Sequence, residues 1–230
     1  MSPSVLSEAS LVDAFLAASG HEAADRIVLR EFGTLAGIPD VVIVETAQQG
    51  VDLGTELQAA RAVTNGHANV MSCLSRRRPH TLGYIVSRSG LGPNYVRRII
   101  SDLRQLGLVD ECETGSVTLA ASYEPPRVRF TALEFKLTDW RRALSQAIRH
   151  QSFARRALVV MPVELEEALR RAANTFRGHG VGSAVFDPVA RRLSFVVRPK
   201  SRRSLSQRAF LDAVGRAASG MSNQQRPEAG

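Results

Sequence analysis

The most constraining feature of the sequence is residues 133–137, Leu-Glu-Phe-Lys-Leu, in which apolar and charged side chains alternate. This period of two predicts a β-strand, with the apolar side chains on one face and Glu134 and Lys136 on the other. A carboxylate and an ammonium therefore lie side by side on an otherwise apolar strand. Buried charge is tolerated when it is paired or bound to a metal, so the alternatives are a solvated ion pair and a functional site.

Composition limits the class of protein. The chain has 230 residues, enough for one large domain or two small ones, and an apolar content of 44% supports a packed core. No apolar run is long enough to span a bilayer, and the sequence does not open with the pattern of a signal peptide. Two cysteines and five scattered histidines suggest neither a disulfide framework nor a metal-ligand cluster. We therefore expect a cytoplasmic protein with no membrane partner.

Charge points to a polyanionic partner. The formal net charge is +8, which favours DNA, RNA or a membrane surface. Acidic residues dominate segment 1–66 and arginines dominate segment 125–230, as expected if the two segments fold together. Of the 30 basic residues, only Lys136 and Lys200 are lysines. Lysine is a compact point charge, so either position 136 requires a small cation or the lysine is there by chance.

The first segment places two further carboxylates near predicted elements. Residues 4–19 read as a helix, and Glu8 lies near its start, where a negative charge suits the helix dipole unless the fold turns it toward a site. Residues 26–32 read as a strand and residues 33–39 as a turn. Asp40 then opens the β-branched run 41–44, which is typical of a buried strand. Asp40 is either a turn aspartate bonded to its own backbone or a functional charge.

Residues 67–124 form a distinct unit with helices beginning near Val70, Thr81 and Pro93, followed by a hairpin around Thr114. This order resembles a winged helix-turn-helix domain. The resemblance implies that the third helix enters the DNA major groove and that its first residues meet the bases. The candidate DNA-binding residues on that helix and in the basic run before the second helix are Asn94, Tyr95, Arg97, Arg98, Arg76, Arg77 and Arg78.

Two observations leave an alternative for this unit. Asp110, Glu111 and Glu113 make the hairpin acidic, which argues against its contact with phosphate. Winged helices also serve as protein–protein modules, so docking of a partner protein is the alternative to DNA contact.

The rest of the chain alternates strands and helices. Gln146 lies among apolar residues in a helix that Thr138 and Asp139 introduce. The remaining predicted elements are strands at 127–137, 158–161, 181–186 and 193–197, helices at 140–154, 164–176 and 206–218, and a disordered tail at 221–230.

The sequence resembles the PD-(D/E)xK nuclease superfamily in three places. These are Pro39-Asp40 before one strand, Glu134-x-Lys136 on another strand, and Gln146 in the helix that follows. The resemblance implies a restriction-endonuclease-like α/β fold, a mixed sheet flanked by helices. It further implies that Asp40 and Glu134 hold Mg²⁺ or Mn²⁺ and that Lys136 orients or activates the attacking water. Many members add a glutamate from the first helix and a glutamine after the motif, and Glu8 and Gln146 match these.

The spacing of the motif departs from the family. Asp40 and Glu134 lie 94 positions apart, and removing residues 67–124 shortens the interval to 36. We therefore expect a discontinuous core of residues 1–66 and 125–220 with an inserted winged helix-turn-helix domain.

The function that follows is divalent-metal-dependent hydrolysis of DNA phosphodiester bonds, because Mg²⁺ prefers carboxylate oxygens and can neutralise a phosphate. The alternatives are a DNA-binding regulator or adaptor that does not cleave and a protein-interaction module. A second copy of the chain, as a homodimer, is a further candidate partner.

Overall fold

The computed structural model describes residues 7–19, 24–48, 50–58, 60–203 and 205–224. None of the helices in these ranges is both long enough and apolar enough to pass through a membrane. The described chain forms two compact units, each built from two separate segments of the sequence. We name them the sheet unit, Met1–Leu53 with Val128–Ser206, and the helical unit, Gly54–Arg127 with Gln207–Gly230.

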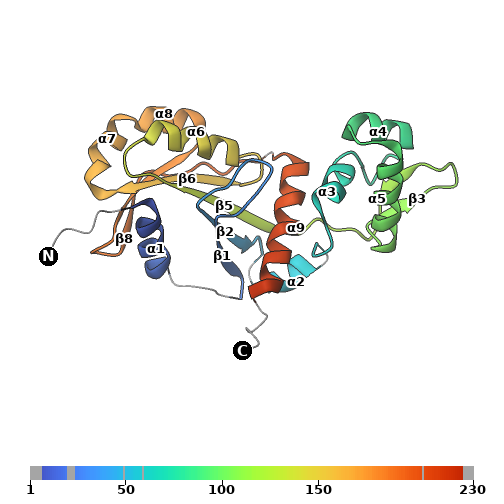
Figure 1. The fold of residues 1–230 in the computed structure, drawn as a ribbon, viewed down its shortest axis with the longest axis horizontal. Helices are drawn as coiled ribbons and strands as arrows, with labels where there is room; N and C mark the ends of the chain where they lie inside the picture. Colours follow the sequence, from blue (N-terminus) through green and yellow to red (C-terminus); the bar gives the residue numbers. More distant parts are fainter. Residues whose placement is uncertain (1–6, 20–23, 49, 59, 204, 225–230) are drawn as a thin grey trace. The chain divides into compact units, whose positions relative to one another are not determined.

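The sheet unit is an α/β structure around a mixed six-stranded sheet (Figure 1). The strand order is β1-β2-β5-β6-β7-β8. Strands β5, β6 and β7 are parallel, and the other neighbouring pairs are antiparallel. The mixed sheet flanked by helices was predicted from the sequence. The strands are β1 (Arg26–Arg30), β2 (Val41–Thr46), β5 (Val128–Phe135), β6 (Arg156–Pro162), β7 (Gly182–Asp187) and β8 (Arg192–Val197).

Helix α1 (Glu8–Ser19) covers one face of this sheet (Figure 1). The hydroxyl of Ser7 accepts a hydrogen bond from the backbone N–H of Ser10, which satisfies a free donor at the start of the helix. Its apolar stripe packs against alternate side chains of the strands, because residues two apart on a strand share a face. The buried members of the stripe are Leu11, Val12, Phe15 and Leu16, and they meet Val41, Leu133, Phe135, Leu158, Val160, Ala184 and Phe186.

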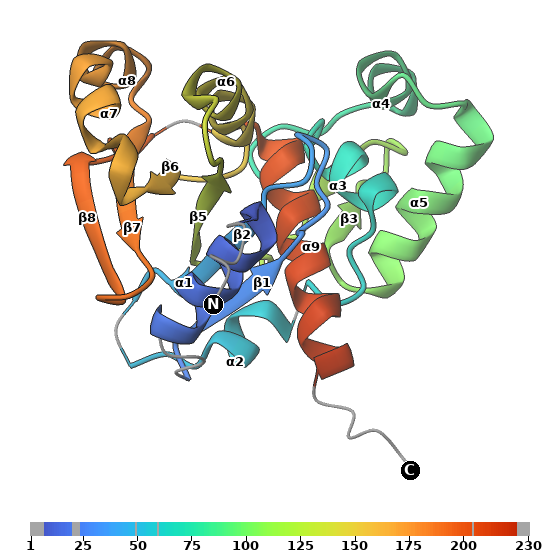
Figure 2. The ribbon, with the colours of Figure 1, turned by 60° about the vertical axis from the view of Figure 1, so that its left-hand side comes forward.

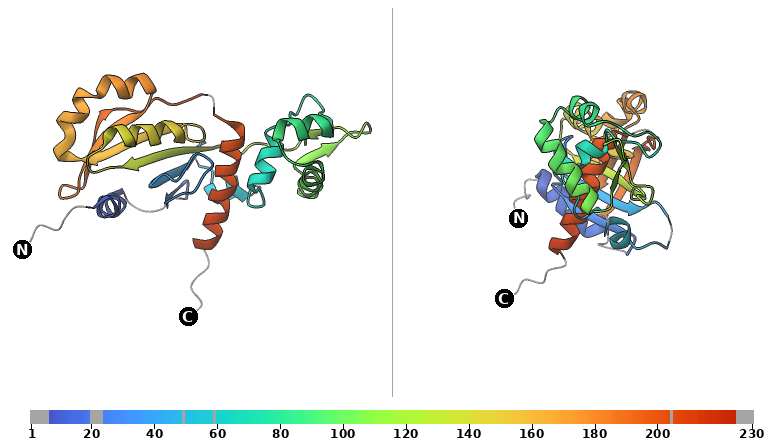
Figure 3. Two further views of the ribbon diagram at one scale, coloured as in Figure 1. Left: turned by 45° about the horizontal axis from the view of Figure 1, so that its top comes forward. Right: turned by 90° about the vertical axis from the view of Figure 1, so that its right-hand side faces the viewer.

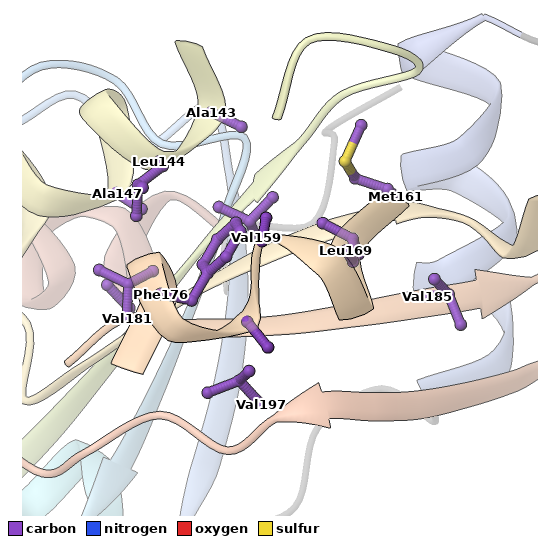
Figure 4. Close-up of a cluster of buried hydrophobic side chains, with 13 residues drawn as sticks. Ala143, Leu144, Ala147, Val159, Met161, Leu169, Phe176, Val181, Val185 and Val197 are labelled. Atoms are coloured by element: carbon purple, nitrogen blue, oxygen red, sulfur yellow. The ribbon is translucent and has the colours of Figure 1, made fainter. Parts of the chain in front are cut away.

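Three helices cover the opposite face, α6 (Trp140–His150), α7 (Glu166–Arg171) and α8 (Ala173–His179). Figure 4 shows their apolar side chains meeting those of β6, β7 and β8. The carboxylate of Asp139 accepts from the backbone N–H of Arg142 and caps α6, as its sequence predicts. The single helix predicted at 164–176 is instead a 3₁₀ turn (Val163–Leu165) followed by α7 and α8, with the break at Ala172.

The helical unit contains five helices and a two-stranded hairpin in its described part. The hydroxyl of Thr81 accepts from the N–H of Tyr84 and caps α4, and Gly90 ends α4 in the left-handed conformation. Figure 3 shows the hairpin extending beside α5. The elements are α2 (Leu53–Gln58), α3 (Asn65–Met71), α4 (Leu82–Ser89), α5 (Pro93–Gln105), β3 (Val109–Glu111), β4 (Val117–Leu119) and α9 (Gln207–Gln224).

Helix α9 packs beside α3 (Figure 2), so the last helix belongs to the helical unit. The sequence-based boundaries grouped residues 54–66 and 207–220 with the sheet instead. Helix α3 also begins at Asn65, five residues before the predicted start near Val70, because Thr64 caps it. Of the predicted disordered tail, residues 221–224 are the end of α9, and residues 225–230 lie outside the described residues.

The packing of α9 allows no side chain at Gly215. A Cβ atom built there would lie 2.1 Å from the carbonyl oxygen of Val63, a backbone atom that cannot move aside as a side chain can. We expect Gly215→Ala to destabilise the protein by about 1–3 kcal/mol in urea denaturation. Gly220→Ala is the matched control in the same helix, since a Cβ there meets nothing within 4 Å and alanine favours helix. Equal effects of the two substitutions would contradict this packing.

Candidate functional site

Pairing of β2 with β5 brings Asp40 to Glu134. Val41 pairs with Leu133 in the antiparallel ladder, so the residues just beyond this pair, Asp40 and Glu134, meet at the same end of the sheet. The Oδ2 atom of Asp40 accepts a hydrogen bond of 2.7 Å from the backbone N–H of Phe135. This bond crosses to another strand and is not the local turn bond considered from the sequence. The runs 41–44 and 127–137, each predicted as a strand, are thus neighbours in the sheet.

Glu134 is buried on the α6 face of the sheet, with 1% of its surface exposed. Its Oε2 atom lies 3.2 Å from Nε2 of His150, the last residue of α6, which is 2% exposed. A buried carboxylate without a partner is costly, and His150 is the side chain that pairs with it. The loop before Asp40 helps to cover His150, since a Cβ on Gly37 would lie 3.6 Å from its Cε1 atom.

Sequence reasoning did not select His150. The sequence feature that could have identified His150 is its position four residues after Gln146, because residues four apart share one face of a helix. Both side chains hold a buried atom without a hydrogen-bond partner among the described residues, Oε1 of Gln146 and Nδ1 of His150. Buried polar atoms of this kind are uncommon in proteins and call for a bound water, ion or functional role. The inner face of α6 therefore contributes two polar groups beside the sheet.

Lys136 lies just beyond the last residue of β5, and its ammonium turns to α1. Its Nζ atom lies 2.7 Å from Oε2 of Glu8 and 2.9 Å from the carbonyl oxygen of Phe135. Glu8, the first residue of α1, therefore faces this end of the sheet. The prediction that Lys136 and Glu134 form a pair on one strand face is corrected, because the strand ends at Phe135 and each charge pairs with a different helix.

Negative charge accumulates around Asp40. Burial raises the pKa of Asp40, and the nearby carboxylates of Glu134 and Glu8 raise it further. The hydrogen bond from Phe135 and the ammonium of Lys136 lower it without cancelling the rise. Three carboxylates thus share this end of the sheet with one ammonium. A divalent cation would relieve this repulsion.

The donor set suits a hard cation. One oxygen of Asp40 and one of Glu134 have no hydrogen-bond partner in the described chain, and carboxylate oxygens are the ligands that Mg²⁺ prefers. A cluster of three or more histidine, cysteine, aspartate or glutamate ligands does not occur among the described residues. Mg²⁺ commonly uses only one or two protein carboxylates and keeps several waters, so two suffice.

The candidate DNA-binding residues belong to the helical unit. Asn94, Tyr95, Arg97 and Arg98 are all exposed near the start of α5. Arg97 donates to the Oδ1 atom of Asn94 at 2.9 Å, and the guanidinium of Arg98 lies 5.0 Å from the centroid of the Tyr95 ring. The basic run between α3 and α4 is exposed at Arg76, Arg77 and Arg78.

The acidic residues of the hairpin have internal partners. The carboxylate of Glu111 pairs with Arg104 of α5 at 2.9 Å, and Asp110 accepts from the backbone N–H of Ala121. Two of the three hairpin carboxylates that argued against phosphate contact thus have partners within the helical unit.

A comparison of the chain with protein-family models, with curated proteins and with solved structures found no match.

Replacing Asp40 tests the crowding of negative charge. In Asp40→Asn the amide oxygen can still accept from Phe135, but the charge is gone. We expect the melting temperature to rise by about 2 °C at neutral pH, because a carboxylate with a raised pKa destabilises the folded state when ionised. The gain should disappear as the pH falls through that raised pKa, since the wild type then becomes neutral too.

The control is Asp187→Asn, which changes a turn carboxylate bonded to the N–H groups of Val189 and Ala190. Millimolar Mg²⁺ or Mn²⁺ should raise the melting temperature of the wild type and of this control but not of Asp40→Asn. A metal effect that survives in Asp40→Asn would remove Asp40 from the ligand set.

Proposed function

We propose that this protein is a divalent-metal-dependent deoxyribonuclease with a restriction-endonuclease-like core, in which Asp40 and Glu134 are the metal ligands. The observation that carries the proposal is the pairing of β2 with β5, which brings these two carboxylates and Lys136 to one end of the sheet. The resemblance to PD-(D/E)xK nucleases requires this arrangement, although the two carboxylates lie 94 residues apart in sequence.

Each residue of the site has a distinct role in this proposal. When bound, the metal supplies positive charge that polarises the scissile phosphate and favours ionisation of a water. The ammonium of Lys136 lies beside this water and stabilises the negative charge that develops in the transition state. Glu8 holds the ammonium from the other side through its 2.7 Å contact. Gln146, a neutral amide, positions groups by hydrogen bonding.

His150 acts through Glu134 and is a positioning residue. Its Nε2 atom fixes one carboxylate oxygen of Glu134 and leaves the other for a cation. Histidine in such a position orients a ligand in the way that outer partners of metal ligands commonly do.

The helical unit supports binding to duplex DNA as a winged helix-turn-helix. The order α3, α4, α5 and hairpin matches this motif, and α5 carries exposed asparagine, tyrosine and two arginines at its start. Arginine suits guanine edges and phosphates, and asparagine suits adenine. The net charge of +8 favours the same partner.

One observation favours a second candidate, a DNA-binding regulator or adaptor that does not cleave. The contact between Glu134 and His150 satisfies a buried carboxylate without any metal. In this alternative the end of the sheet is a charge network with a structural role.

Cleavage assays on linear duplex, single-stranded, branched and supercoiled DNA distinguish these candidates. We expect Glu134→Gln to abolish Mn²⁺ binding in calorimetry together with cleavage, because it removes a ligand charge. Lys136→Ala should keep the metal and lose about 10²–10³-fold in rate, because it removes transition-state stabilisation only. Gln146→Ala should have the mildest effect.

The matched control is Lys200→Ala, which removes the one other lysine of the chain, an exposed residue. It should leave the rate unchanged. Wild-type protein that binds DNA but cleaves none of these substrates with Mg²⁺ or Mn²⁺ would establish the second candidate.

A separate test concerns the helical unit. Arg97→Ala combined with Arg98→Ala should weaken duplex binding and flatten the dependence of affinity on salt by about one unit per lost phosphate contact. Arg170→Ala combined with Arg171→Ala is a control of equal charge on α7. Unchanged affinity and slope in the α5 variant would favour docking of a partner protein.

A further inference from the structure

A cavity of about 160 Å³ lies in the sheet unit, at the end of the sheet opposite Asp40. Strands β5 and β6 begin there, and β2 ends there. Glu45 is five residues beyond Asp40 on β2, so the two ends are separated by about 17 Å along the strand. The cavity is lined by Glu45, Arg129, Phe130, Thr131, Arg155, Arg156 and Ser201.

The walls of this cavity are held by the sheet and by the connector that precedes α9. The backbone N–H of Arg155 donates to the carbonyl of Phe130, and the N–H of Arg202 donates to the carbonyl of Arg155. These bonds fix Ser201 of the connector beside the start of β6. Thr131 pairs with Arg156 in the parallel ladder of β5 and β6. The lining therefore comes from three strands and a segment tied to them.

The charge of the cavity is strongly positive, since three guanidinium groups face one carboxylate. Glu45 lies opposite Arg129 in the ladder of β2 and β5, and Arg129 also donates to the carbonyl of Ala47. The guanidinium groups of Arg155 and Arg156 have no hydrogen-bond or ion-pair partner in the part of the chain described here. Both side chains are exposed and offer all their donors to a ligand.

We propose that this cavity binds a phosphate monoester dianion. The guanidinium fork matches phosphate oxygens two at a time, and the hydroxyls of Thr131 and Ser201 add donors. The formal charge of the lining is +2, which a doubly charged phosphate balances and a singly charged phosphodiester does not. The volume of about 160 Å³ leaves room for one phosphate group and its attachment.

The carrier that fits best is the phosphorylated end of a nucleic-acid strand. Only a terminal phosphate of a strand is a monoester, because internal phosphates are diesters. The choice of a nucleic acid as the carrier rests on the proposed function, whereas the phosphate site itself rests on the cavity. A free phosphate or nucleotide presents the same chemistry, so the experiment separates these sources.

Binding is measured on the full chain in EDTA, so that its outcome does not depend on cleavage. Inorganic phosphate is titrated by calorimetry. Fluorescence anisotropy compares one single-stranded oligonucleotide with a 5′-phosphate, a 3′-phosphate or hydroxyl ends. We expect phosphate to bind and one of the phosphorylated strands to bind about tenfold more tightly than the hydroxyl strand.

Substitutions that remove positive or negative charge from the lining test whether the phosphate binds in this cavity. Arg155→Ala combined with Arg156→Ala should remove both phosphate binding and the preference for a phosphorylated end. Glu45→Gln removes the one carboxylate of the lining and should tighten phosphate binding several-fold. Arg170→Ala combined with Arg171→Ala is again the control of equal charge, and it should keep the preference. Thermal unfolding confirms that each variant is folded.

Three results would overturn the proposal. Wild-type protein that neither binds phosphate nor distinguishes the strand ends would exclude a phosphate site. A preference that survives in the Arg155 and Arg156 variant, or that is lost equally in the α7 control, would place it outside this cavity. Phosphate binding without any strand-end preference would overturn the nucleic-acid carrier and assign the site to a free phosphate or nucleotide.

Discussion

The antiparallel pairing of β2 with β5 is the interaction on which the rest of the structure depends. It joins two segments of the chain that the helical unit separates in sequence, and it closes the sheet across that interruption. It also brings the carboxylate of Asp40 to the backbone N–H of Phe135. The register of the ladder fixes the position of Asp40 relative to β5. A shift of register by one residue would move Glu134 to the face that α1 covers, because side chains alternate along a strand.

The charged residues at this end of the sheet pair with helices on both of its faces. Helix α1 provides Glu8, which pairs with Lys136, and helix α6 provides His150, which pairs with Glu134. Asp40 has no charged partner in direct contact among the described residues, and burial raises its pKa. A protein selected for stability alone would replace such a carboxylate with a neutral residue, so its presence accords with a chemical role.

Local patterns predicted much of the fold. Alternation indicated β5, the β-branched run indicated β2, and Thr81 and Asp139 mark helix starts through side chains that bond within one turn. What the sequence did not reveal depends on contacts between distant residues. His150 reads as one more residue on an apolar helix face until β5 places Glu134 against it. The position of α9 depends likewise on its contact with α3, at the other end of the helical unit's sequence.

The division of each unit into two segments also affects the order in which the protein is completed during synthesis. The sheet unit has all its strands once residue 206 has left the ribosome. The first segment of the helical unit, Gly54–Arg127, is made before the second segment of the sheet unit, but α9 follows only after residue 206. Helix α3 therefore emerges long before its packing partner. A nascent chain therefore completes the sheet unit before the helical unit. A message truncated after codon 206 would yield a complete sheet attached to an incomplete helical unit.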